Sequence, residues 1–169
     1  MNLFVTSPDP IACAQALDDR RLIKGVLETA QLLSTAGYGP YKTTHINHPV
    51  TKWVCRSLVH IAWTQQHFNA LAQEYTFRFG KIHKTAVATA EFAKQSGKTP
   101  VPFENEPQEF QNSARNATLG LDFTNRPVFQ AYRDYLNTKW RLDGAKARWT
   151  QRGAPEWFHE QHNGVLPPS

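Results

Sequence analysis

Apolar residues in the first part of the chain recur at the spacing of a helix. Leu22, Val26 and Leu33, together with their neighbours, fall three or four residues apart, so one face of residues 10–36 is apolar. Gly37 stands where helices commonly end, because glycine adopts the left-handed backbone conformation without strain. The pattern therefore predicts one long helix over residues 10–36.

Three further helices are predicted downstream. Residues 49–79 carry a wide apolar stripe, residues 84–95 are rich in alanine, and residues 126–141 again show helical spacing. Residues 96–124 are rich in Gly, Pro, Asn and acidic residues, which is typical of a long irregular surface segment. Since no segment alternates like a strand, we expect an all-α fold with about four helices in a single domain of residues 1–169.

Composition narrows the class of protein. The chain has no run of about 18 apolar residues, which a membrane-spanning helix needs, and its first residues lack the basic and apolar regions of a signal peptide. Cys13 and Cys55 lie far apart, which suits a reducing cytoplasm and excludes a cysteine-based zinc finger. No nucleotide-binding loop, metalloprotease, esterase or deaminase signature is present. We expect a cytoplasmic monomer with no membrane partner.

The positive charge is concentrated near the C-terminus. The chain carries a net charge of +5, and residues 126–152 alone hold seven bases and two acids, with aromatic rings between them. Cations that meet phosphates beside rings that stack on bases are typical of nucleic-acid binding. The alternative is a helix with an apolar core face and a solvated basic face. The candidates for DNA contact in this C-terminal segment are Lys146, Arg148, Trp149 and Arg152.

The first predicted helix carries the clearest candidate for catalysis. Arg21, Lys24 and Glu28 fall on one helix face, next to Arg20. A carboxylate beside cations stays ionised, so Glu28 could stabilise a developing positive charge or accept a proton. Lys24 is a candidate nucleophile, because nearby cations favour the neutral amine. The alternative is a salt-bridged, solvated helix face.

Two polar segments add candidate contacts to phosphate or base. Residues 41–48 precede a predicted helix N-terminus, where free N–H groups favour an anion. Residues 78–83 gather cations at a helix C-terminus, where the dipole alone would stabilise them. Two histidines without a third ligand make a metal site unexpected, and capping of the helix by Asn47 or His48 is the alternative. The candidates are Tyr41, Lys42, Thr44, Asn47, Arg78, Lys81 and His83 for binding, and His45 and His48 for catalysis.

The segments DDRRLIKGVLETAQLLSTA, YKTTHINHP, EYTFRFGKIH and AKARWTQR resemble a family of uncharacterised proteins of phages and large viruses, over nearly the whole chain. The layout is also similar, more distantly, to the pyrimidine-dimer DNA glycosylases of the T4 endonuclease V type. Arg21 and Glu28 keep the offset of seven that separates a His from the catalytic Glu in that family. The resemblance implies an all-α enzyme that acts on damaged or modified double-stranded DNA without a cofactor, in a bacterial host cytoplasm if a phage encodes it.

Two departures bear on the attacking amine. In the T4-type enzymes the nucleophile is the α-amine of residue 2, but Asn2 is bulky and should leave Met1 in place. Leu27 and Gln31 stand where that family has arginines. The nucleophile would then be the Met1 amine, Lys24, Lys42 or water. Two other hypotheses are a base-modifying or nucleotide-processing enzyme that uses His45 and His48, and a non-catalytic nucleic-acid-binding accessory protein.

Overall fold

The computed structural model describes residues 1–158 and is mostly helical, which confirms the all-α prediction. A two-residue antiparallel hairpin, β1 (Arg115–Asn116) with β2 (Leu121–Asp122), interrupts the long irregular segment. Across residues 1–158 no helix is both long and apolar enough to cross a membrane. The α-helices are α1 (Pro10–Ala16), α2 (Asp19–Thr35), α3 (Pro49–Val54), α4 (Leu58–Phe79), α5 (Lys84–Ser96) and α6 (Val128–Asp143), with 3-10 turns η1 (Ala117–Leu119) and η2 (Gly144–Lys146).

The two longest predicted helices are each broken in two, so the prediction of continuous helices was wrong. The backbone is extended at Leu17 and Asp18, between α1 and α2. The Asp18 carboxylate accepts a hydrogen bond from the Trp140 indole at 2.8 Å, and this contact favours the break. Ser57 breaks the second helix, because its extended backbone lets its hydroxyl accept from the His60 N–H and begin α4.

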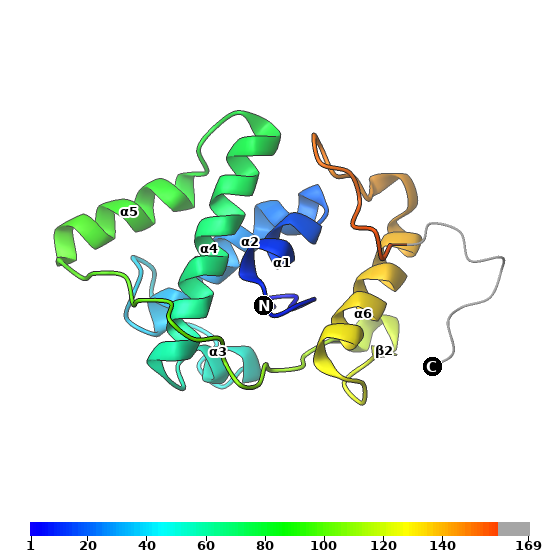
Figure 1. Cartoon of the computed structure of the whole chain (residues 1–169), viewed down its shortest axis with the longest axis horizontal. Coiled ribbons are helices and arrows are strands. Elements are labelled where there is room, and N and C mark those ends of the chain that lie inside the picture. The colour runs from blue at the N-terminus through cyan, green and yellow to red at the C-terminus, as the bar shows by residue number, and fades with distance from the viewer. Residues whose placement is uncertain (159–169) are drawn as a thin grey trace.

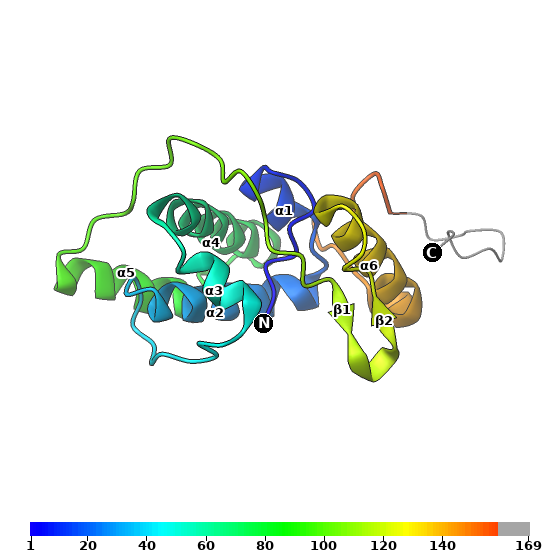
Figure 2. The same ribbon diagram turned by 90° about the horizontal axis from the view of Figure 1, so that it is seen from below.

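The N-terminal segment lies at the centre of the molecule. In Figures 1 and 2, residues 1–9 run between α2 and α4 on one side and α6 on the other. Leu3 and Val5 are buried, so this segment is part of the hydrophobic core. Tyr132, Tyr135 and Leu136 of α6 are buried as well, which confirms the core interpretation for these three residues of the basic stretch.

A histidine in the core makes stability depend on pH. His67 is fully buried, its ring stacks on Trp63, and its Nδ1 lies 3.0 Å from the Pro10 carbonyl. Because a carbonyl oxygen can only accept, Nδ1 carries the proton of a neutral imidazole. Burial lowers the pKa of His67 to about 4.

We expect the folded state to lose stability as the pH falls below 6.5. In the unfolded chain His67 has an ordinary pKa near 6.5 and is protonated below that pH. In the folded chain His67 stays neutral until the pH falls to about 4. The free energy of unfolding is therefore fully available above pH 6.5. It should fall by about 2 kcal/mol between pH 7.5 and pH 5. Urea unfolding of the wild type and of His67→Asn at both pH values measures it. Parallel pH dependences of the two proteins would exclude the assignment.

Candidate active site

The polar stripe of α2 lines a pocket of about 190 Å³. Arg21, Lys24 and Glu28 lie together in its wall, as their spacing predicts. Lys139 and Asp143 of α6 and Phe4 of the N-terminal segment complete it, although no pattern in the sequence places them beside Glu28. The lining residues are Phe4, Arg20, Arg21, Lys24, Glu28, Lys139 and Asp143.

Glu28 differs from the other acids around α2 in having no partner. Its side chain is partly buried, and within residues 1–158 no hydrogen bond or ion pair engages its carboxylate. Arg21, by contrast, pairs with Asp18 at 3.0 Å and with Asp143 at 3.2 Å. These pairs offset the charge of Arg21. In the described part of the chain, three cations of the pocket therefore remain without a carboxylate partner, namely Arg20, Lys24 and Lys139.

Phe4 supplies the aromatic surface of this pocket. Its backbone has a φ of 49°, in the left-handed region that non-glycine residues seldom adopt. The Asn2 side chain accepts from the N–H groups of Leu3 and Phe4 and donates to the Ser113 carbonyl, so it holds this bend in place. The Phe4 ring stacks on Tyr135, with 6.1 Å between centroids.

The loop of residues 41–48 lies at the far end of the same α2 stripe. The Thr44 carbonyl accepts a hydrogen bond from the Thr35 hydroxyl, and the Thr44 N–H donates to the same hydroxyl. Thr35 follows Glu28 by seven residues, which is about 10 Å along a helix. Tyr41 is partly buried and donates to Thr85. Lys42, His45 and Asn47 are exposed. No group of three or more potential metal ligands occurs in residues 1–158.

His48 caps a helix. Its Nδ1 accepts a hydrogen bond from the Val50 N–H at 3.2 Å, which confirms the capping alternative for this residue. Burial lowers the pKa of His48, and the nearby α-ammonium of Met1 and the charges of His45 and Arg115 lower it further. The N-terminal amine therefore lies close to this loop, whereas Phe4, three residues later, lines the pocket.

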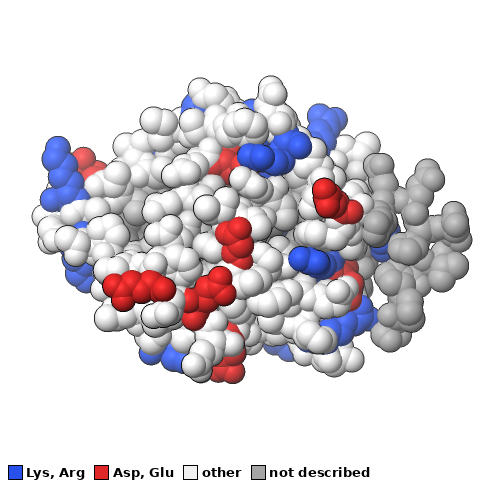
Figure 3. Space-filling model, in the orientation of Figure 1, with Lys and Arg blue, Asp and Glu red and all other residues white. Residues whose placement is uncertain are grey.

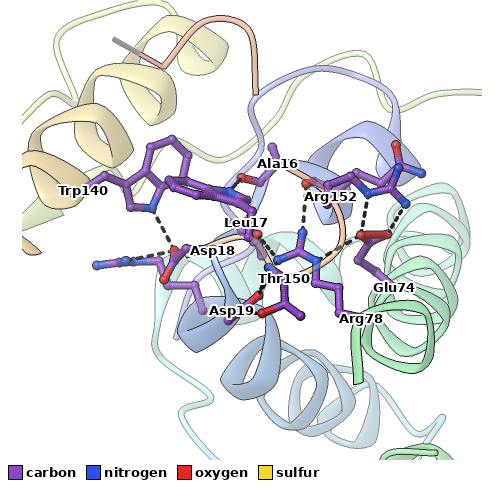
Figure 4. A network of polar contacts seen from close by, with 12 residues as sticks. Ala16, Leu17, Asp18, Asp19, Glu74, Arg78, Trp140, Thr150 and Arg152 are labelled. Carbon is purple, nitrogen blue, oxygen red and sulfur yellow. Dashed lines mark hydrogen bonds and ion pairs between the residues drawn. The ribbon is translucent and has the colours of Figure 1, made fainter. Parts of the chain in front are cut away.

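Arg78 is buried in an ionic network instead of facing solvent (Figure 4). Its guanidinium donates to Glu74 at 3.1 Å, to Asp19 at 3.1 Å and to the carbonyls of Leu17 and Gln15. The expectation that Arg78 clamps a phosphate is therefore wrong. The other members of that predicted cluster lie apart from it. Lys81 is exposed, and the partly buried His83 accepts from the Thr85 N–H to cap α5.

Residues 147–153, here called the C-terminal strap, bind the junction of α1 and α2 (Figure 4). Trp149 donates to the Ala16 carbonyl and packs edge-on against Trp140, at 4.9 Å between centroids. Arg152 donates two hydrogen bonds to Glu74, at 2.7 and 2.8 Å. Both side chains thus have structural partners, contrary to the expectation that they are free for DNA.

The exposed cations at the strap remain candidates for phosphate contact. Lys146 and Arg148 are exposed, and the Arg148 carbonyl accepts from the Asp19 N–H at 2.8 Å, which places Arg148 at the start of α2, next to Arg20. On the face drawn in Figure 3, basic and acidic side chains are interspersed among the described residues. That face therefore shows no continuous basic surface for a duplex.

Within residues 1–158 the pocket thus combines an unpaired carboxylate, which can stabilise a developing positive charge, with cations, which can bind phosphates. A family model described as pyrimidine dimer DNA glycosylase matches residues 1–86, about half of the 169 residues, and the chain belongs to this family. No curated protein and no solved structure shows significant similarity to the chain. The match contains Glu28 and Lys24 but ends before α6, so Lys139 and Asp143 come from outside it.

Proposed function

We propose that this protein is a DNA glycosylase that removes a damaged or modified base from double-stranded DNA, with Glu28 as the central catalytic group. One observation carries the proposal. A partly buried carboxylate without a partner in residues 1–158 lies in a basic pocket, inside the part of the chain that matches a DNA glycosylase family. A solvated structural salt bridge would have paired Glu28 with Lys24, four residues before it on α2.

The cations around Glu28 would bind the sugar-phosphate backbone. Arg20, Lys24 and Lys139 line the pocket, and Arg148 lies near Arg20 at the start of α2. Phosphate contacts position a duplex without reading its sequence. The candidates that extend this surface are Lys146 beside the strap and Tyr41, Lys42, Thr44, His45 and Asn47 in the loop at the other end of the stripe.

The reaction divides between an amine and the carboxylate. The amine nitrogen would bond to the sugar C1′, and the bond from C1′ to the base would break, with its electron pair leaving on the base, which takes up a proton. Positive charge that develops on the sugar is stabilised by Glu28, which then accepts the proton that the amine loses. The C1′–O4′ bond of the sugar then opens, and O4′ takes up the proton held by Glu28, which leaves an imine between the amine and C1′. Water would hydrolyse this imine, or it would lose a C2′ proton and the 3′ phosphate by elimination.

Two amines are the preferred candidates for this role. Lys24 lines the pocket itself. The Met1 amine begins the segment that reaches the pocket at Phe4, and three residues span at most about 10 Å. Lys42 lies on the loop beyond Thr35 and is farther along the stripe. We therefore favour Met1 or Lys24 as the nucleophile.

Borohydride trapping on damaged DNA tests this function. Plain, ultraviolet-irradiated and modified-base duplexes are incubated with the full chain and borohydride. We expect base release from one of the damaged duplexes and a covalent protein–DNA adduct, with the modified amine identified by mass spectrometry. Lys24→Arg removes that amine, and Lys81→Arg is the matched control on an exposed lysine outside the pocket.

Each outcome of the trapping experiment separates the hypotheses. Base release without an adduct assigns water as the nucleophile. DNA binding that weakens steeply with salt, without turnover on any duplex, would favour the non-catalytic accessory module. No observation favours chemistry by His48, because its Nδ1 already accepts from the Val50 N–H.

A further inference from the structure

Phe4 is the one aromatic side chain in the wall of a pocket otherwise lined by charged residues of the described chain. Leu3 and Val5 on either side of it are buried in the core, but Phe4 is only partly buried. An apolar ring beside Arg20, Lys24 and Lys139 offers what a nucleotide requires, since cations bind its phosphate and a ring can stack on its base.

The Phe4 ring is supported by two tyrosines of α6 that do not line the pocket. It stacks on Tyr135 with an interplanar angle of 28°, and Tyr132 meets it edge-on at 6.2 Å. Asn2 fixes the backbone by accepting from the Phe4 N–H and by donating to Ser113. A partly exposed ring with this support loses little conformational freedom when a base packs on it.

The size of the pocket limits what stacks there. Its volume is about 190 Å³, below the roughly 300 Å³ at which pockets for larger ligands begin. The enclosed part of the pocket therefore suits a single base, with the sugar and phosphate at its open side. Enzymes that act on a base in a duplex extrude a nucleotide into such a pocket.

We propose that Phe4 is the stacking platform for a single nucleobase extruded from the duplex into the Glu28 pocket. This inference rests on the proposed function, because it takes DNA as the substrate. It adds to that function a residue that selects an extruded base for entry into the pocket. Phe4 takes no part in proton transfer, so it acts on binding and on base extrusion.

A fluorescent base tests the platform without requiring turnover. The probe is a duplex that carries 2-aminopurine opposite a tetrahydrofuran abasic analogue, where the base is easily extruded. The protein is the full chain with Glu28→Gln, which keeps the pocket shape. We expect the 2-aminopurine fluorescence to rise on binding, because the extruded base leaves the stack of neighbouring bases that quenches it in the duplex.

Variants at Phe4 then identify the ring. Adding Phe4→Leu should reduce the rise in fluorescence and weaken binding of the probe by roughly 5- to 150-fold, whereas Phe4→Tyr should preserve the affinity. Phe4→Gly removes the ring and also relieves the positive φ, so it keeps the test valid if the leucine variant folds poorly. Thermal melting of each variant controls for folding.

Two results would overturn the platform. One is the absence of a fluorescence rise with the Glu28→Gln chain. The other is a rise and an affinity that are the same with leucine as with phenylalanine at position 4. Neither result depends on base release. A chain that excises bases but fails this test keeps its proposed function, and one that stacks the probe without any turnover on damaged DNA loses the proposed function alone.

Discussion

Replacing Glu28 with Gln should lower the rate of base excision by roughly 10²- to 10⁴-fold, the range that a positioned acid–base group contributes. Gln keeps the size of the side chain but can neither carry the negative charge that faces the sugar cation nor accept a proton from the amine. DNA binding should be retained or slightly tighter, because the substitution removes an anion from a pocket in which three cations have no carboxylate partner among residues 1–158. Single-turnover excision and duplex affinity, measured on one preparation, separate the two effects.

The structure supplies a matched control for this substitution. Glu91→Gln makes the same chemical change on the exposed face of α5, away from the pocket, and should leave excision unchanged. Melting temperatures of both variants should stay close to that of the wild type, since Glu28 holds no partner within residues 1–158. Excision by Glu28→Gln within about threefold of the wild type would remove Glu28 from the reaction.

Replacing Glu74 with Ala should destabilise the fold by about 3–5 kcal/mol, because it strips a buried charge network of its central anion. The Glu74 carboxylate binds Arg78 and Arg152, and the Arg78 side chain has no exposed surface. Without Glu74, Arg78 keeps only Asp19 and two carbonyls. The melting temperature should fall by about 6–20 °C for a chain of this length.

An exposed ion pair is the comparison for Glu74. Glu109→Ala breaks the ion pair with Arg56, in which the Glu109 side chain is 76% exposed and the Arg56 side chain 51% exposed. This substitution should lower the free energy of unfolding by at most about 1 kcal/mol. Adding Arg152→Ala to Glu74→Ala should cost little more, since the partner of Arg152 is already gone. Equal losses in Glu74→Ala and Glu109→Ala would show that the buried network does not stabilise the fold.

The sequence predicts which parts of the chain are helical, but it does not predict where the two long helices are interrupted. The apolar spacing of residues 10–36 and 49–79 is genuine, because α1 and α2, and likewise α3 and α4, contribute to one core. The breaks depend on contacts that no local pattern contains. Asp18 ends the first run partly because Trp140, more than a hundred residues later, donates to its carboxylate. Ser57 was the one local signal, as a helix-capping residue after Cys55.

The pocket was predictable only where it depends on the spacing within one helix. Arg21, Lys24 and Glu28 share a face of α2, so their proximity follows from the helix period. Lys139 was visible as part of the basic stretch, but its place beside Glu28 depends on how α6 packs. Phe4 gave no signal, because a positive φ at a phenylalanine is set by contacts such as those of Asn2.

Charge alone could not separate cations that bind DNA from cations that hold the protein together. Arg78 and Arg152 both follow the local pattern of an exposed basic patch, yet they share the Glu74 carboxylate. Trp149 lies past the end of the helical pattern, but Trp140 and the Ala16 carbonyl engage it. The deciding partners of Arg152 and Trp149 are distant in sequence, on α4 and α1. Glu74 lies only four residues before Arg78, so the helix period alone could have predicted that pair.

The wall of the pocket is shared between two parts of the polypeptide. The carboxylate comes from the half that defines the family, whereas Lys139 and Asp143 come from α6, beyond residue 86. Relatives could inherit an identical first half and still meet their substrates with differently charged surfaces, because the positions of α6 that line the pocket can vary without altering the carboxylate or the core face of α6. Membership of the family and the choice of substrate can therefore evolve separately in proteins with this fold.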